Sequence, residues 1–327
     1  MNRLVESDVT TTVAKAKEKG FEPDARPHAR QAWRDDYREN GYLVARNLIP
    51  EDLCDRARRA FAEEVKPFKG YLYRQASANP ETHHLSEHGY MLNSILNIQD
   101  LSAAKFPEFR RAGLAILTNE ALHDRLRILL GEPGKIVQSM FFEGNPKTWA
   151  HQDTYYLDSS NLGEMIGAWI AVEDIQPGAG RFFVYPGSHK IDIKKNGGDF
   201  DIAFHHERYK KLVLEIIAKF GLDCQAPALR KGDVLFWSSK TIHGSLETTQ
   251  PEYSRASFTA HAIPQSTSFL QYQTRTKPLN LRTVNGIQVN FPKDQNRVKN
   301  RAMMAVETTF PRTFQFAKKV AIKLVTR

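Results

Sequence analysis

The first part of the chain carries the spacing of hydrophobic positions that is typical of helices. Over residues 32–62 the pattern predicts a helix, a turn, a short extended piece at 41–45 and a second helix, which Pro50 opens with acidic residues in its first turn. Over residues 103–130 leucines recur on one side of a helix, and the sequence Gly-Glu-Pro-Gly predicts its end. Helices are therefore expected before residue 134.

After residue 134 the pattern changes to short runs that are rich in β-branched and aromatic residues and are separated by turn sequences. These runs lie at 136–142, 166–172, 181–185, 234–237 and 256–262. Helices followed by many short strands favour a jelly roll or small barrel buttressed by helices, rather than a parallel α/β sheet. The predicted fold is mainly β with flanking helices.

Three segments are predicted from these patterns. Residues 1–30 alternate charges without an apolar stripe and are expected to be a loosely ordered lead-in. Residues 31–265 hold the helices and strands of the main domain, with a polar insert at about 190–227 that contains one helical stretch at 207–220. Residues 266–327 form a basic C-terminal extension.

Composition and cysteine content narrow the class of protein. The chain of 327 residues is 41% hydrophobic and 25% charged, which is ordinary for a globular protein and excludes a mainly disordered or fibrous one. No apolar run is long enough to span a membrane, and the polar N-terminus lacks the core of a secretory signal. Two cysteines, Cys54 and Cys224, are too few for a disulfide framework. A cytoplasmic protein is expected.

The net charge of +9 is concentrated at the C-terminus. From residue 275 onward there are 12 lysines and arginines against Asp294 and Glu307, so this segment is +10 and the rest of the chain is −1. Nucleic-acid binding by the body of the protein is therefore not expected. Within residues 308–325, apolar side chains form one helical stripe. A helix docked on the barrel, a dimer contact, a solvated tail and a peripheral contact with an anionic membrane all remain open; the oligomeric state is undetermined.

The candidate chemistry is the motif His151-Gln152-Asp153, with His243 far downstream. On a strand, residues two apart point to the same face, so His151 and Asp153 would both face a barrel interior. Two imidazoles and one carboxylate are the ligands of the facial triad of non-haem Fe(II) oxygenases. A polar loop at the end of a strand is the alternative explanation of the motif.

Arg255 is the second candidate. It lies on a strand-like run over residues 254–258, in which it shares a face with Ser257. An arginine that faces a barrel interior needs an anion, because an unpaired buried charge is costly, and a carboxylate is its best geometric partner. That carboxylate belongs either to a ligand or to a nearby Asp or Glu of the chain.

These motifs resemble the phytanoyl-CoA dioxygenase family. The resemblance covers roughly residues 41–263 and rests on the order and spacing of His151-Gln152-Asp153-Thr154-Tyr155-Tyr156, residues 167–174, residues 185–190, Ile242-His243-Gly244-Ser245 and Arg255. It implies a double-stranded β-helix, that is, a jelly-roll or cupin-like core, that binds Fe(II) and uses 2-oxoglutarate and O2 as co-substrates.

The resemblance also implies roles for single residues. His151, Asp153 and His243 fall on the iron ligands, and Arg255 falls on the residue that pairs with the far carboxylate of 2-oxoglutarate. Residues expected to border or contact the co-substrate are Ser245, Trp169, Met140, Gln152 and Gln138. Trp169 and Met140 could instead be core residues. Tyr155 and Tyr156 are candidates for the substrate mouth, with core packing as the alternative.

The reaction expected from the resemblance is hydroxylation with release of succinate and CO2. Related halogenases have a small residue at the position of Asp153, so the aspartate disfavours halogenation, whereas desaturation or ring formation stays open. The expected substrate is a small metabolite or a saccharide- or lipid-linked molecule, and the basic tail favours an anionic one. A non-catalytic jelly-roll binding protein and a cupin-type metal-dependent hydrolase or isomerase are the alternatives.

Overall fold

The structure is a computed structural model that describes residues 30–311 and residue 314. The lead-in over residues 1–29 and most of the apolar stripe expected over 308–325 lie outside the described residues. The helices are α2 (Arg30–Asn40), α3 (Glu51–Ala60), continued by a π-helical turn (Phe61–Val65), α4 (Pro107–Leu117), α5 (Glu120–Leu130), α6 (His206–Lys219) and α7 (Val298–Thr309). Short 3-10 helices lie at Ile98–Asp100, Asp153–Tyr155, Ser188–Lys190 and Lys194–Asn196. No helix in the described part of the chain is long and apolar enough to cross a membrane.

The main sheet has the strand order β1-β9-β7-β11-β5-β15-β14, and β4 also pairs with β5. Its strands are β1 (Tyr42–Ala45), β4 (Ile95–Leu96), β5 (Gly134–Phe142), β7 (Ile166–Ala171), β9 (Val234–Ser238), β11 (Ser257–Pro264), β14 (Leu281–Val284) and β15 (Ile287–Asn290). All of its pairs are antiparallel except β15 with β5. The five strand-like runs predicted from the sequence are β5, β7, β8, β9 and β11, so this prediction is confirmed.

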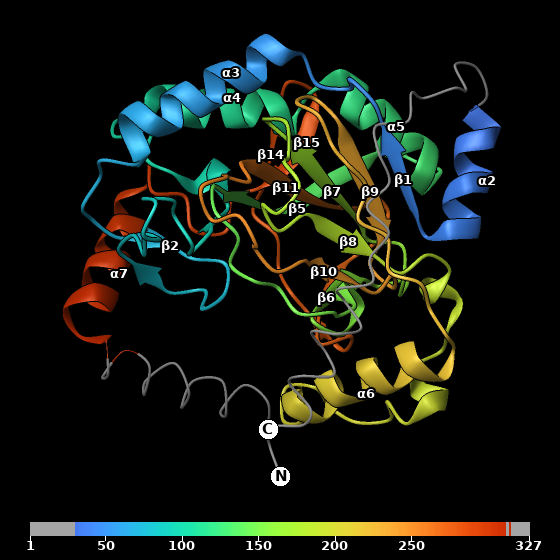
Figure 1. Cartoon of the computed structure of the whole chain (residues 1–327). Helices are drawn as coiled ribbons and strands as arrows, with labels where there is room; N and C mark the ends of the chain where they lie inside the picture. Colours follow the sequence, from blue (N-terminus) through green and yellow to red (C-terminus); the bar gives the residue numbers. More distant parts are fainter. Residues whose placement is uncertain (1–29, 312–313, 315–327) are drawn as a thin grey trace.

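Smaller sheets accompany the main sheet: β6, β8 and β10 lie below it in Figure 1, and β2 lies to the left near α7. The remaining strands are β2 (Leu72–Tyr73), β3 (Pro80–Glu81), β6 (Leu157–Ser159), β8 (Phe182–Val184), β10 (His243–Ser245), β12 (Phe269–Gln271) and β13 (Arg275–Thr276). β10 pairs with β8, β6 with β12 and β12 with β13, while β2 pairs with β3. This arrangement confirms the predicted fold, a mainly β jelly roll with flanking helices.

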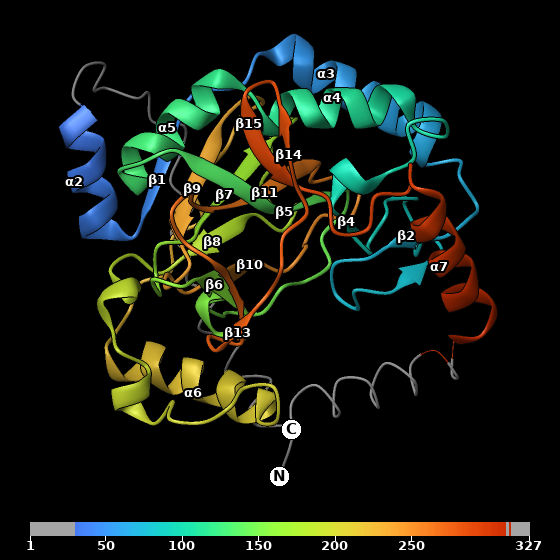
Figure 2. The same ribbon diagram turned by 180° about the vertical axis from the view of Figure 1, so that it is seen from behind.

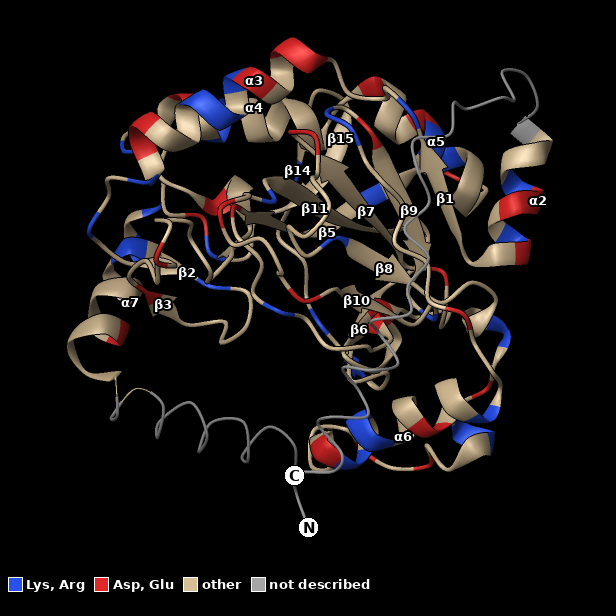
Figure 3. Cartoon of the chain, viewed as in Figure 1, with Lys and Arg blue, Asp and Glu red and all other residues tan. Residues whose placement is uncertain are grey.

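Helices α3 and α4 cover the outer face of the main sheet (Figures 1 and 2). Phe109 of α4 contacts Phe141 of β5, with ring centroids 5.0 Å apart, and Phe258 of β11 packs on Phe141 at 4.9 Å. Because side chains alternate along a strand, Phe258, Ala260 and Ala262 enter this outer core, while Thr259 and His261 face the opposite side. Charged residues gather on the surrounding helices and loops, and the central strands carry few of them (Figure 3).

The region over 103–130 forms two helices, so the single helical stretch predicted there was wrong. α4 ends at Leu117, and α5 begins at Glu120. Asn119 caps α5, since its side chain accepts a hydrogen bond from the backbone N–H of Leu122 at 3.3 Å. Leucine spacing continues across the break, so periodicity alone does not reveal it, whereas the capping residue does.

The polar insert forms α6 and the loops on either side of it. α6 buries Tyr209, Leu212, Val213, Ile216 and Ile217. Tyr209 packs on Tyr155, with ring centroids 4.6 Å apart. The insert therefore covers the outer side of the small sheets, at the opposite end of the molecule from α3 and α4 (Figure 1).

The C-terminal residues also contribute to the folded core. β15 pairs in parallel with β5, and β14 pairs with β15, so residues 281–290 form one edge of the main sheet. Asp100 packs beneath this region: its Oδ2 accepts the backbone N–H of Lys293 at 3.0 Å, and its Oδ1 has no hydrogen-bond partner among the described residues. Burial, with 4% of the residue exposed, raises the pKa of Asp100 to about 8.

This carboxyl group predicts a pH-dependent stability. Because the pKa of Asp100 is higher in the folded protein than its ordinary value of 3.8, the folded state binds the extra proton and stability falls as pH rises from about 4 through 8. At pH 8.5 we expect Asp100→Asn to increase the free energy of unfolding by on the order of a few kcal/mol, and so to raise Tm. Near pH 4 the substitution should have little effect on either quantity. Thermal unfolding at both pH values measures this, and an equal shift at both would contradict it.

Candidate metal centre

Reciprocal backbone hydrogen bonds hold two of the three predicted ligands together. The N–H of His151 donates to the carbonyl of His243, and the N–H of His243 donates to the carbonyl of His151, both at 2.9 Å. This bridge continues the ladder in which β10 pairs with β8. Two histidines 92 positions apart in the sequence are thereby placed side by side, with ring centroids 4.4 Å apart.

The two imidazole rings are oriented by their own backbone. Nδ1 of His151 lies 2.9 Å from the carbonyl oxygen of Trp149, and Nδ1 of His243 lies 2.9 Å from that of Thr241. A carbonyl only accepts, so each Nδ1 carries the proton and each Nε2 presents its lone pair. Burial lowers the pKa of His243 to about 4, which keeps this ring neutral, as a metal ligand must be.

Asp153 completes the cluster. The sequence pattern predicts a strand here, but Asp153 does not lie on one. It begins the 3-10 helix Asp153–Tyr155. Its Oδ1 lies 3.4 Å from Nε2 of His151 and 3.6 Å from Nε2 of His243. Donor atoms about 2.1 Å from one metal ion and at right angles to each other are about 3 Å apart, so these distances fit a shared ion.

The charge of Asp153 is set by opposing effects. Burial alone would raise the pKa of Asp153, but His243, His151 and His261 outweigh it, so the pKa lies well below its ordinary range. The carboxylate is therefore ionised at neutral pH. Two imidazole nitrogens and one carboxylate oxygen form the donor set that non-haem iron sites use.

Arg255 lines the same cavity as the three ligands. It is 2% exposed, its Nη1 donates to the carbonyl of Gly180 at 3.2 Å, and its Nε has no hydrogen-bond partner among the described residues. Burial lowers its pKa to about 10, and no charged group of the described chain opposes that shift. The alternative of a structural ion pair with a nearby Asp or Glu therefore finds no support in residues 30–311.

Three other expected co-substrate contacts also line this cavity: Ser245, Trp169 and Met140. Ser245 follows His243 on β10, and its hydroxyl oxygen accepts the N–H of Thr148 at 2.7 Å, which leaves its proton to donate. Trp169 of β7 and Met140 of β5 come from neighbouring positions of the main sheet, since both are opposite Thr259 of β11.

The two glutamines are placed differently from the expectation. Gln152 lies between the inward-facing His151 and Asp153 in extended backbone, so its side chain points away and donates to the carbonyl of Lys240. It does not line the cavity. Gln138 shares the inward face of β5 with Met140, but it lies opposite His261, two positions further along, and is not among the lining residues.

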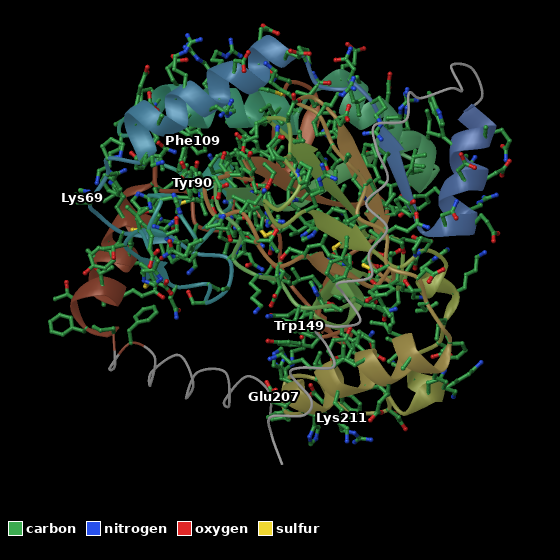
Figure 4. The ribbon with its side chains drawn as sticks, in the orientation of Figure 1. Lys69, Tyr90, Phe109, Trp149, Glu207 and Lys211 are labelled. Carbon is green, nitrogen blue, oxygen red and sulfur yellow. The ribbon has the colours of Figure 1, made fainter. Side chains whose placement is uncertain are left out.

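The two tyrosines differ from each other. Tyr155 is buried against Tyr209 of α6, which matches the core alternative. Tyr156 is half-buried beside the site, with its ring 6.1 Å from that of His151 and its hydroxyl 3.0 Å from Nδ1 of His206. Trp149 lies on the same side, near the N-terminal end of α6 and Glu207 (Figure 4).

Several cavity residues were not predicted from the sequence. Gln75, Phe142, Thr148, Phe182, Trp237, Thr259 and His261 also line it. The sequence did carry a signal for Thr259 and His261. They continue along β11 the alternation that begins with Arg255, two residues before the strand, and Ser257. Trp237 carried no such signal, because its role depends on the distance between β9 and the 3-10 helix of Asp153.

Trp237 reaches the site across Gly167. A Cβ atom at Gly167 would lie 2.2 Å from Cζ2 of the indole ring, so β7 must have glycine there. We expect Gly167→Ala to lower the free energy of unfolding by about 1–3 kcal/mol, as overpacking does. Urea denaturation measures it. The same substitution in a Trp237→Phe background should cost less, and an equal cost in both backgrounds would contradict this contact.

Comparisons with known proteins identify relatives of the chain. The family model of phytanoyl-CoA dioxygenase (PhyH) matches residues 37–256. The chain is 26% identical over 232 residues to the peroxisomal phytanoyl-CoA dioxygenase of Homo sapiens, covering 64% of this chain and 61% of that protein's length. It is 24% identical over 263 residues to phytanoyl-CoA dioxygenase domain-containing protein 1 of Danio rerio, covering 69% of this chain and 87% of that protein.

Solved structures share the fold at low identity. The α-ketoglutarate-dependent epimerase SnoN from nogalamycin biosynthesis has a TM-score of 0.56 and 16% identity, covering 80% of this chain and 98% of that one. EctD from S. alaskensis, solved with 2-oxoglutarate and 5-hydroxyectoine, has a TM-score of 0.53 and 17% identity, covering 85% and 92%. Since the family model spans more than half of its residues, the chain belongs to the phytanoyl-CoA dioxygenase family of iron- and 2-oxoglutarate-dependent oxygenases.

Proposed function

We propose that this protein uses Fe(II), 2-oxoglutarate and O2 to hydroxylate an unactivated C–H bond of a small metabolite or of a saccharide- or lipid-linked substrate. The observation that carries the proposal is the buried, uncompensated Arg255 in the cavity of His151, Asp153 and His243. A metal site and a guanidinium in one cavity fit a dianion with a chelating end and a free carboxylate. 2-Oxoglutarate has that form.

Each residue of the cavity then has a defined role in this reaction. His151, Asp153 and His243 hold the ion through two Nε2 atoms and Oδ1. Arg255 receives the far carboxylate of the co-substrate, and the Ser245 hydroxyl is free to donate to the same group. Bound iron supplies the oxidation, in which substrate R–H, 2-oxoglutarate and O2 give R–OH, succinate and CO2. Trp169, Met140 and Phe182 keep water from the cavity.

Hydroxylation is proposed ahead of other outcomes for one reason at the site. Asp153 would supply a carboxylate ligand where related halogenases have a small residue, so halogenation is disfavoured. Structures with the same fold are named for other outcomes, the carbocyclase SnoK and the epimerase SnoN, so product analysis decides among reactions that begin at the same C–H bond. Gln75, an exposed residue that lines the cavity, and Tyr156, whose ring lies 6.1 Å from that of His151, are the side chains proposed to meet the substrate.

The first test is spectroscopic and needs no substrate. Anaerobic addition of Fe(II) and 2-oxoglutarate is expected to produce a weak visible charge-transfer band, which requires chelation of the metal by the keto acid. A cupin-type hydrolase or isomerase has no use for Arg255, and a non-catalytic binding protein need not bind the keto acid. The absence of the band in fully metal-loaded protein would overturn the proposal.

The second test identifies the reaction. Succinate release is measured across a panel of acyl-CoA, amino-acid-derived, saccharide-linked and secondary metabolites, and the product of each positive is identified by mass. A gain of one oxygen atom supports hydroxylation. A loss of two hydrogens or an unchanged mass would overturn hydroxylation while leaving the iron and 2-oxoglutarate chemistry in place.

A further inference from the structure

The two oxygens of Asp153 have different surroundings. Oδ1 faces the Nε2 atoms of His151 and His243. Oδ2 accepts a hydrogen bond from Nε1 of Trp237 at 2.9 Å and lies 3.5 Å from Nε2 of His261. The metal-facing side and the protein-facing side of the carboxylate are thus separate.

His261 is buried in the cavity without another role in the proposed function. It is 4% exposed and lies on β11, six positions after Arg255 and on the same inward face. Its ring meets that of Trp237 at 80°, with centroids 5.9 Å apart, so the two side chains approach Oδ2 together. Its Nδ1 has no hydrogen-bond partner among the described residues. Its Nε2 is therefore the ring atom with a polar neighbour, and that neighbour is a metal ligand.

The state of the carboxylate matters for an open metal site. A carboxylate that binds through one oxygen occupies one position and, with two histidines, leaves three positions for co-substrate and O2. If the same group turns and binds through both oxygens, it takes a fourth position. Trp237 opposes that rotation, because it would break the hydrogen bond of the indole to Oδ2. Nε2 of His261, 3.5 Å from the same oxygen, is placed to act as a second donor. Partners of this kind orient metal ligands in general.

We propose that His261 is a positioning residue which, together with Trp237, holds Oδ2 of Asp153 so that Asp153 presents one oxygen to the metal. The inference deepens the proposed function, since it concerns the same centre. It needs only that Nε2 of His261 carries a hydrogen, and the carboxylate oxygen that faces this nitrogen can only accept one. The indole nitrogen of Trp237 can only donate, so its hydrogen bond to Oδ2 of Asp153 has a fixed direction.

The test compares three variants by binding of Co(II), whose visible spectrum reports coordination without turnover. In His261→Gln the side-chain amide nitrogen takes the place of Nε2, whereas in His261→Asn the shorter amide takes the place of Nδ1. We expect His261→Phe and His261→Asn to weaken Co(II) binding about 10- to 100-fold and to alter the spectrum. His261→Gln should stay within a few-fold of the wild type. The affinity of each Co(II) form for 2-oxoglutarate, measured calorimetrically, should follow the same order.

Several outcomes separate this role from simple packing. Thermal unfolding of the metal-free variants shows which of them fold. If folded His261→Phe and His261→Asn bind Co(II) and 2-oxoglutarate as the wild type does, the proposal is overturned. If all three variants lose Co(II) equally, the identity of the nitrogen is irrelevant and the proposal is also overturned. If the Co(II) order holds while the wild type with Fe(II) shows no 2-oxoglutarate band, the positioning role stands and the oxygenase proposal fails.

Discussion

Succinate release by the Asp153→Ala variant is expected to fall by more than about 100-fold. This is more than the loss of a residue that only hydrogen-bonds to a metal ligand usually costs. Asp153 supplies the single charged donor of the cluster, and its Oδ1 lies between the two imidazole nitrogens. Its removal leaves two neutral ligands for a divalent ion. The affinity for Fe(II), measured under anaerobic conditions, should fall with the activity.

Asp124→Ala is the matched control, because this carboxylate is exposed on α5 and pairs with Arg127 of the same helix. It should leave both metal affinity and succinate release unchanged. Thermal unfolding checks that Asp153→Ala is folded, because the substitution also removes the acceptor of the Trp237 indole N–H. A folded Asp153→Ala variant that still couples 2-oxoglutarate consumption to product at the wild-type rate would show that the metal lies elsewhere.

Replacing Arg255 with methionine is expected to have two opposite effects. The affinity for 2-oxoglutarate should fall by at least about 30-fold, because losing one partner of a buried charge pair costs about 2–5 kcal/mol. The ligand-free protein should become more stable, on the order of 1 kcal/mol, because the buried guanidinium has no counter-ion in the described chain until a ligand supplies one. Calorimetry and urea denaturation measure the two effects.

Arg46→Met provides the contrast. Nη1 of Arg46 lies 2.7 Å from Oδ2 of Asp233, which is itself buried, so its loss should destabilise the protein and leave 2-oxoglutarate binding unaffected. Arg255→Lys keeps the charge without the planar fork and should bind 2-oxoglutarate at an intermediate affinity. Destabilisation by Arg255→Met as large as that by Arg46→Met, with 2-oxoglutarate affinity retained, would mean that Arg255 serves the fold instead of the ligand.

Local sequence patterns predict much of the fold because each central strand has one strongly apolar face. β5, β7, β9 and β11 were all found from their β-branched and aromatic content. Local patterns fail where two different arrangements have the same periodicity. The leucines on α4 and α5 continue one helical stripe, so the break at Asn119 was visible only through its capping side chain.

The residues of the site also fall into two groups, those that the sequence predicts and those that it does not. His151, Asp153, His243 and Arg255 carry a spacing that sequence alone can recognise, and the structure brings them to one cavity. Trp237 of β9 and His261 of β11 meet Asp153 from distant parts of the chain. Alternation along β11 puts His261 on the inward face, but no interval in the sequence encodes either contact with Asp153. Gln152 shows the converse: it lies inside the motif, yet the extended backbone turns its side chain away.

The backbone bridge between His151 and His243 has a consequence for which ion the protein carries. Both rings are anchored by main-chain carbonyls and by a ladder that forms with the fold, so the nitrogens are in position before any ion arrives. A preformed set of ligands discriminates poorly among first-row divalent ions, and zinc or copper would bind to it more tightly than iron. Occupancy by iron then depends on what the cell supplies, and protein purified aerobically should contain a mixture of metals until it is stripped and reloaded.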